Sequence, residues 1–299
     1  MGIRFVFNPY DSLLNAISQD RQQLSNATLQ VSSGRKLISI ADNPAATASV
    51  IENNFETAAV DQFTQSVSSV QTRLQAADSA LNSTTQALTS AISLATEGAN
   101  GTLSQDQRNG IAQQVDSLQQ EVLGLANSQF QGTYLFGGTV CNTAPFVADS
   151  SAPSGVRYLG NGQTNSVEIV AGQYVQNGLP GSAIFNGASA DVFQALHDLS
   201  AALRRGDSAG IVSASGELQS AFSNVTVQRV SYGGMLQKLE AAGTTLTNEQ
   251  TSLASQQNSL LAADPAKAIT DMTTAQTQLE AALAATGRVT QNSLLNYLK

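Results

Sequence analysis

Apolar positions recur at alternating spacings of three and four residues from Val60 to Ala95, with polar residues between them. This heptad pattern is typical of a helix that buries one stripe against a partner helix. It predicts a helix over about residues 44–97, which would be about 80 Å long at ~1.5 Å per residue. A helix of that length must lie along other helices. The stripe consists of Val60, Phe63, Val67, Val70, Leu74, Ala77, Leu81, Thr84, Leu88, Ala91 and Ala95.

Two shorter helices are predicted by their start signals. Ser104 and Gln107 form a capping-box pattern before a stripe that ends near Asn127. Asp191 is a suitable N-cap for a helix that stops at Gly206. The stripe residues are Ile111, Val115, Leu118, Val122 and Leu125 in the first helix, and Val192, Phe193, Leu196, Leu199 and Leu203 in the second.

A second long helical tract is expected from about Ser208 to Leu261, with Leu246, Leu253 and Leu260 spaced by seven. Asp264 followed by Pro265 is a signal for a new helix, because Asp favours the N-cap and Pro the first helical position. The apolar repeat then continues to the C-terminus.

Both ends of the chain carry the same apolar repeat but lack an evident partner in the middle of the chain. Tyr10, Ile17, Leu24 and Val31 are spaced by seven. Isolated helices of this length are marginal in water, so the two ends must pair with each other or with neighbouring copies. Our hypothesis is intermolecular burial through an assembly interface made of Ile17, Leu24, Val31, Ile269, Leu279, Leu283, Leu294, Leu295 and Leu298.

Glycines, prolines and short β-like runs gather between Phe130 and Asn186. The sequence therefore predicts a mainly α fold, in which a long antiparallel helix bundle or coiled-coil rod is built from both chain ends and carries a small β-rich inserted domain. The expected divisions are a terminal coiled-coil assembly domain (1–40 with 265–299), a helical rod domain (41–145 with 187–264, with a β-hairpin near 130–145) and a β-rich outer insert (146–186).

The composition narrows the choice of function. Charged residues make up only 12% of the 299 residues, and the net charge of −8 argues against a nucleic-acid partner, which requires clustered basic residues. No apolar run approaches the ~20 residues of a membrane span, so we expect no membrane partner. The first residues show no secretory signal of the cleaved type.

The stretch Gly34-Arg35-Lys36 is the strongest candidate for a phosphate-binding loop, but it lacks the second glycine and the strand that a P-loop requires. We interpret Gly34 instead as the residue that ends a helix, and Asp42-Asn43-Pro44 as the start of the next. Gly34, Arg35, Asp42 and Pro44 would then form a joint between two helical domains.

No arrangement of residues points to catalysis. His197 and Cys141 are the only histidine and the only cysteine, too few for a zinc site or a thiol–imidazole pair. The carboxylates are scattered and form no evident acid–base couple. We therefore expect no enzyme activity, no metal and no cofactor.

Four segments resemble the bacterial flagellin superfamily. SSGRKLISIADNPAA is similar to its N-terminal signature, and TLSQDQRNGIAQQVDSLQQEVLGLANSQFQGTYLFGGTVCNTAPF to its second core helix and the hairpin that follows. DVFQALHDLSAALRRGD also resembles the family, as does the C-terminal AKAITDMTTAQTQLEAALAATGRVTQNSLLNYL. The opening Gly2-Ile3-Arg4-Phe5 departs from the usual start of the family.

The resemblance implies an axial protein of the flagellum that is exported by the flagellar type III apparatus. The short insert and the ending from Ser293 to Leu298 resemble the members that join hook to filament. Such a junction protein would assemble with itself into a ring, contacting another hook-associated protein on one side and flagellin on the other. An export chaperone is also implied, and the location would be the extracellular hook–filament junction.

Two alternatives remain open at this point. The chain could be flagellin itself, because flagellin is similar at both ends. It could also be a secreted coiled-coil adhesin or adaptor whose insert binds a ligand.

Overall fold

The structure is a computed structural model that describes residues 9–37, 39, 43–187 and 190–297. The chain divides into two compact units, Met1–Ala59 with Glu249–Lys299, and Val60–Asn248. The division lies within the two longest helices, and each unit is described separately below.

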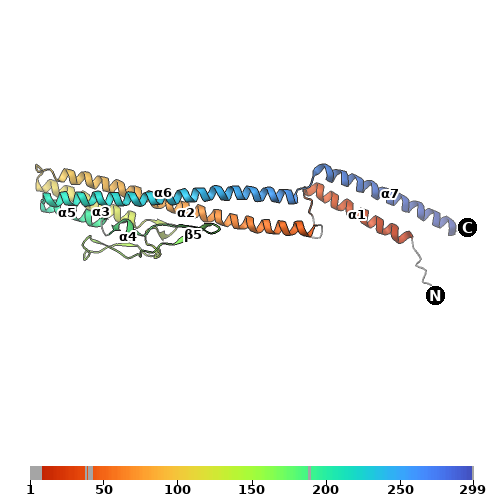
Figure 1. Cartoon of the computed structure of the whole chain (residues 1–299), viewed down its shortest axis with the longest axis horizontal. Helices are drawn as coiled ribbons and strands as arrows, with labels where there is room; N and C mark the ends of the chain where they lie inside the picture. The colour runs from red at the N-terminus through yellow and green to blue at the C-terminus, as the bar shows by residue number, and fades with distance from the viewer. Residues whose placement is uncertain (1–8, 38, 40–42, 188–189, 298–299) are drawn as a thin grey trace. The chain divides into compact units, whose positions relative to one another are not determined.

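Helices dominate the described chain, which confirms the mainly α fold (Figure 1). The two longest are those predicted from the heptad pattern, and both carry residues of both units. The helices are α1 (Pro9–Ser33), α2 (Pro44–Gly98), α3 (Gln105–Ala126), α4 (Gly181–Ile184), α5 (Val192–Arg205), α6 (Ser208–Leu261) and α7 (Pro265–Tyr297).

The predicted α2 stripe is the side of the helix that is buried. Ten of its residues are buried, and Phe63 is half-buried. On α6 a seam with a spacing of seven is also buried, with Tyr232 as its one aromatic member, at Ile211, Leu218, Val225, Tyr232, Leu239, Leu246 and Leu253. The helical part of Val60–Asn248 is therefore held by stripes of the kind that the sequence predicts.

The predicted helix starts are confirmed by their hydrogen bonds. Ser104 and Gln107 form the full capping box at the start of α3. The carboxylate of Asp191 accepts hydrogen bonds from the amides of Phe193 and Gln194, both at 2.9 Å. Asp264 likewise accepts one from the amide of Ala266 at 2.9 Å, with Pro265 as the first residue of α7.

Eight short strands form four antiparallel pairs within Val60–Asn248. Most strand residues lie between Phe130 and Asn186, where the sequence predicts short β-like runs. The strands are β1 (Gln129–Phe130), β2 (Thr133–Tyr134), β3 (Phe146–Ala148), β4 (Val156–Tyr158), β5 (Ser166–Val170), β6 (Gln173–Gln176), β7 (Asn186–Gly187) and β8 (Ala190–Asp191).

A cluster of aromatic rings packs the β-rich insert against the helices. Phe146 is at its centre, with ring centroids 4.9 Å from Tyr158, 5.4 Å from Phe185 and 5.4 Å from Phe193 of α5. Phe136 meets Phe185 edge-to-face at 5.3 Å. Edge-to-face and tilted rings at these distances attract one another beyond the effect of area burial.

In the other unit, α1 and α7 pack along one another (Figure 1). The buried residues of this pair are Ile17, Ala27, Ala268 and Ala275. Of the two possibilities that the sequence leaves open for the chain ends, pairing with each other is the one observed within the chain.

Candidate functional site

The segment that follows α1 adopts the predicted helix ending. Gly34 has φ +67°, the left-handed conformation that glycine reaches without steric cost, and its amide donates to the Gln30 carbonyl at 2.9 Å. Gly34 thus ends α1 as the sequence predicted, and no phosphate-binding turn is formed by these residues.

The backbone of Gly34–Lys36 pairs with the connection between α6 and α7. Arg35 and Ala262 form an isolated antiparallel bridge. The Lys36 amide donates to the Leu261 carbonyl at 2.8 Å, and the Ala263 amide donates to the Gly34 carbonyl at 2.9 Å. The two connections of this unit are therefore fixed to each other.

Lys36 has a structural role in this joint. Its ammonium donates to the carbonyl of Ser259 at 2.7 Å, in the last turn of α6. A cation is favourable there because the last carbonyls of a helix lack partners and carry partial negative charge. Arg35 is exposed. Of the two basic residues, only Lys36 therefore stabilises the end of α6.

Asn43 caps the start of α2. The Asn43 side-chain oxygen accepts from the Ala46 amide at 3.1 Å, and Pro44 takes the first helical position. Asp42, which the sequence also placed in the joint, lies outside the described residues.

The residues of the predicted assembly interface differ in exposure. Ile17 is buried in the α1–α7 pair, and Leu24 and Leu279 are half-buried. Val31, Ile269 and Leu283 are exposed. The side chains of Leu294 and Leu295 and the whole of Leu298 lie outside the described residues. Contact of these residues with another copy stays a prediction.

The α1–α7 pair buries Ile17 and three alanines and leaves several other branched residues exposed. Ala27, Ala268 and Ala275 are at most 6% exposed, whereas Ile269 is 49% and Leu283 45% exposed. Leu14, Leu29 and Val31 of α1 are exposed as well. Most of the branched apolar surface of this pair therefore faces away from its own seam and is available to another molecule.

An exposed apolar ridge on α2 was missed by the sequence reasoning. Phe55 is 73% exposed and Ile51 50% exposed, one helical turn before it. Ala48 and Ala58 extend the ridge at spacings of three. This second 3-4-3 repeat, offset from the buried stripe, was the signal that could have found it.

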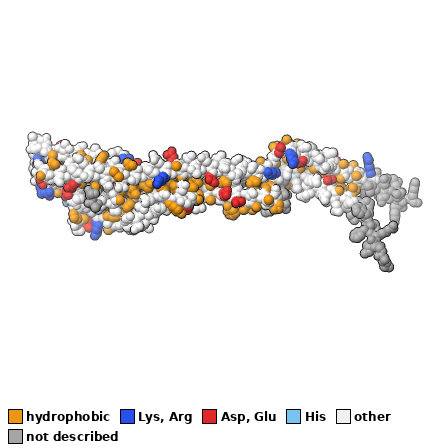
Figure 2. Space-filling model, viewed as in Figure 1, with side chains coloured by type: hydrophobic (Ala, Val, Ile, Leu, Met, Phe, Trp, Pro, Cys, Tyr) orange, Lys and Arg blue, Asp and Glu red, His pale blue; other side chains and the backbone are white. Residues whose placement is uncertain are grey.

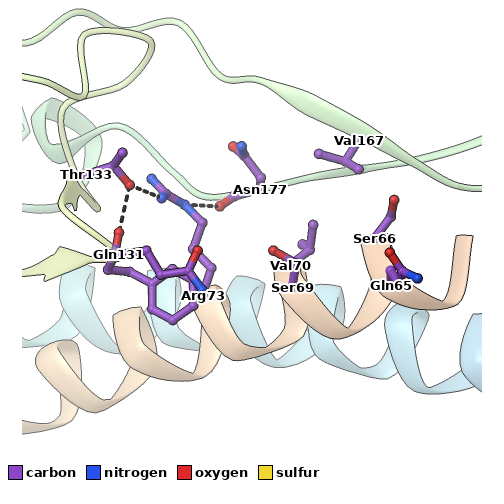
Figure 3. Close-up of a pocket in the computed structure, with 10 residues that line it drawn as sticks. Gln65, Ser66, Ser69, Val70, Arg73, Gln131, Thr133, Val167 and Asn177 are labelled. Carbon is purple, nitrogen blue, oxygen red and sulfur yellow. Dashed lines mark hydrogen bonds between the residues drawn. The ribbon is translucent and has the colours of Figure 1, made fainter. Parts of the chain in front are cut away.

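A cavity of about 480 Å³ lies beside Arg73, between α2 and the β-rich insert (Figure 3). The guanidinium of Arg73 donates to the Thr133 hydroxyl at 2.9 Å and to the carbonyls of Tyr134 and Asn177 at 3.1 and 3.2 Å. The remaining lining residues are Gln65, Ser66, Ser69, Val70, Phe130, Gln131 and Val167. All three partners of Arg73 are neutral oxygens, two in the β1–β2 hairpin and one in the insert, so its role is to attach both to α2.

Three ion pairs hold elements of Val60–Asn248 together. Arg229 of α6 contacts the two carboxylate oxygens of Asp78 on α2 at 3.0 and 3.3 Å. Arg204 of α5 pairs with Asp116 of α3, which also accepts from the Ser200 hydroxyl at 2.5 Å. The third pair joins Arg157 to Asp149 within the β3–β4 hairpin at 3.2 Å.

The pKa shifts within the described chain are caused by folding contacts. Burial raises the pKa of Tyr232 to about 12 and also raises the pKa values of Tyr158 and Asp191. Hydrogen bonds from the hydroxyl and amide of Ser151 lower the pKa of Asp149. Asp191 is a helix cap and Asp149 supports a turn, so these shifts follow from folding rather than from a reaction centre.

The described residues contain no cluster placed to bind a metal and no helix suited to cross a membrane. No group of three or more His, Cys, Asp or Glu side chains is placed to hold a metal ion. No helix there is long and apolar enough to cross a membrane. His197 is exposed and Cys141 is half-buried.

Comparison with protein families gives two matches. Residues 7–141 match the bacterial flagellin N-terminal helical region, and residues 216–298 match the bacterial flagellin C-terminal helical region. The matched segments contain all of α1, α2, α3 and α7, and most of α6.

One curated relative is flagellar hook-associated protein 3 of Escherichia coli strain K12, 25% identical over 178 residues. The match covers 59% of this chain and 55% of the relative, so the chain spans about half the length of that protein.

Solved structures share the fold. A putative flagellar hook-associated protein from Vibrio parahaemolyticus aligns with a TM-score of 0.69 and 21% identity, covering 74% of this chain and 100% of that chain. The flagellar junction protein FlgL from Legionella pneumophila aligns with a TM-score of 0.61 and 12% identity, covering 72% of this chain and 100% of that chain. At these identities the likeness concerns the fold.

Proposed function

This chain belongs to the bacterial flagellin superfamily, and we propose that it is a structural subunit that joins the hook of the flagellum to the filament. The name of the curated relative and the fold shared with hook-associated proteins support the junction role over that of the filament subunit. The role is mechanical and involves no catalytic step.

The observation that carries the proposal is the exposure of branched apolar side chains on the α1–α7 pair. Alanines are buried in the seam, whereas Ile269 and Leu283 are exposed. Full burial of one such aliphatic side chain contributes roughly 1.5–3 kcal/mol. Ile269 and Leu283 are about half covered in the monomer, so each can gain about half of this contribution when further copies pack around the pair.

We place the assembly interface on the residues predicted from the sequence, with the exposed Val31, Ile269 and Leu283 as its described outer members. Gly34, Arg35 and Pro44 would form the joint between the terminal pair and the long helices. The three-part division into terminal domain, helical rod and outer insert belongs to the same proposal.

The proposed partners follow from the junction role. Copies of the chain form a ring, with another hook-associated protein on the hook side and flagellin on the filament side. An export chaperone accompanies the chain before secretion, and the final location is the extracellular part of the flagellum.

Deletion of the gene tests the proposal. The mutant is expected to retain its hooks and to release flagellin into the medium, and the full chain supplied in trans is expected to restore filaments. Filaments of normal length on the deletion strain would exclude the junction role. If the mutant hooks carry all their junction proteins and neither the cells nor the medium contain flagellin, the chain is flagellin instead.

A further inference from the structure

The apolar ridge on α2 is turned away from the seam of its own helix. The ridge consists of Ala48, Ile51, Phe55 and Ala58, all exposed. In the same stretch the side of α2 that faces α6 is polar at Asn53, whose side-chain amide is 3% exposed and donates to the Leu253 carbonyl at 3.1 Å. The largest apolar side chains of this stretch are thus available to a partner.

The surroundings of the ridge are acidic. Glu52 and Glu56 flank Phe55 along α2, and within the described residues no ion pair engages either of them. Figure 2 shows hydrophobic and acidic side chains next to one another along the surface that α2 forms. A partner is therefore expected to present an apolar face with a cation beside it.

One helical surface of the same chain has these properties. Val227 and Val230 of α6 are 61% and 71% exposed. Ser223, Gly234 and Lys238 are exposed and lie on the same side of the helix by their spacing. We call this set, Ser223, Val227, Val230, Gly234 and Lys238, the Val230 face.

The two surfaces are complementary in shape as well as in charge. A side chain at Gly234 would meet nothing within 4 Å, and Ser223 is small, so the valines of the Val230 face are flanked on both sides by low positions. Phe55 is the largest exposed side chain of the ridge. It could pack into one of these low positions, as a knob residue packs into a hole on a facing helix. Exposed aromatic side chains that fill a partner's pocket are typical anchors of protein interfaces.

We infer that the Phe55 ridge of one copy docks on the Val230 face of a second copy, with Lys238 beside Glu52 and Glu56. The inference rests on the proposed self-assembly of the chain and identifies a contact outside the terminal helices. A ridge paired with an identical ridge would bring four glutamates together and is disfavoured. Because the two surfaces differ, the contact is heterologous, and repeated heterologous contacts generate rings or helical tubes.

Cross-linking between copies tests the pairing directly. Chains carrying Cys141→Ser with Phe55→Cys and chains carrying Cys141→Ser with Val230→Cys are given different tags and expressed together in the deletion strain. Each chain then has one cysteine, so any disulfide joins two copies. Oxidation of isolated flagella is expected to yield a linked pair that contains both tags.

A matched control uses Val212→Cys in place of Val230→Cys, because Val212 is 64% exposed on the same side of α6. It lies five turns before Val230, about 27 Å away along the helix, so it tests the position of the contact on α6. This control is expected to give no mixed pair with Phe55→Cys. Mixed pairs of equal yield from Val212 and Val230, or linked pairs with one tag only, would overturn the inferred pairing. Absence of any link between copies would overturn it as well and would point to a different flagellar protein on the ridge.

Charge reversal provides an independent readout. Glu52→Lys with Glu56→Lys is expected to lower incorporation into flagella about tenfold, and the added Lys238→Glu is expected to restore most of it. If the triple variant is no better than the double one, the inferred pairing is wrong. The junction role is tested separately, because flagellin release from the deletion strain does not depend on which surfaces meet.

Discussion

The phenolic oxygen of Tyr232, on α6, accepts a hydrogen bond from the backbone amide of Leu179 at 3.1 Å. Tyr232 is fully buried, and Leu179 follows the β5–β6 hairpin of the insert. Arg73 of α2 holds the neighbouring carbonyl of Asn177. The segment 177–179 is thus held by both long helices, and it determines how the insert is attached.

Replacement of Tyr232 by Phe tests this attachment. The ring remains, but the Leu179 amide loses its partner in a buried place, which costs about 1–3 kcal/mol. Chemical denaturation of the full chain is expected to show this loss of unfolding free energy. Tyr174→Phe is the matched control, since Tyr174 is 64% exposed and its change is expected to stay within about 0.5 kcal/mol. Equal effects of the two substitutions would contradict the role of the buried hydroxyl.

The same hydroxyl predicts a dependence of stability on alkaline pH. Burial raises the pKa of Tyr232 to about 12, whereas the unfolded value is about 10. The folded state therefore retains the proton, and the associated stability is complete below about pH 10 and is lost as pH rises toward 12. The unfolding free energy of the wild type should fall through this window by roughly 2–3 kcal/mol more than that of Tyr232→Phe. Parallel pH profiles for the two proteins would contradict the prediction.

Arg73→Met is expected to loosen the insert locally. The substitution removes three hydrogen bonds from a charged donor, and a loss of roughly 1.5–3 kcal/mol is expected. Arg73→Lys should not restore the loss, because one ammonium cannot reach three acceptors that a planar guanidinium reaches together. Hydrogen exchange is expected to speed up at Thr133–Tyr134 and near Asn177.

Arg205→Met provides the control for this experiment, because Arg205 is exposed in the last turn of α5. Faster exchange in the Arg205 variant, or unchanged exchange at Thr133–Tyr134 in the Arg73 variant, would show that Arg73 does not attach the insert.

The helices and the way they are joined could be predicted from the sequence because their determinants are local. The stripe from Val60 to Ala95, the capping box at Ser104 and the start at Pro265 each depend on residues within a few turns, and all three are confirmed. The shortage of partners elsewhere left two possibilities for the chain ends, pairing with each other or with neighbouring copies.

The contacts of the insert could not be predicted in the same way. Arg73 reaches Thr133 and Asn177 across 60 and 104 positions of sequence. A lone arginine in a polar helix gives no sign of such partners. The orientation of Phe55 was missed for a different reason, because one strong stripe on α2 was taken as the whole apolar content of the helix.

Leu283→Asp tests the exposed surface of the terminal pair. Leu283 is 45% exposed, so the monomer should fold normally, with an unchanged circular dichroism spectrum. A charge in the proposed contact would remain buried without a partner and should prevent incorporation into flagella. Ala281→Asp adds the same charge at an exposed position two residues away and should be tolerated. Normal incorporation of the Leu283 variant would remove this surface from the interface.

The position of the protein on intact flagella tests the central claim most directly. Gold-labelled antibody against a tag inserted in the exposed turn at Ser151 is to be imaged by electron microscopy. The junction role predicts label in one narrow band where hook meets filament. Label along the whole filament, or none on the flagellum, would contradict it.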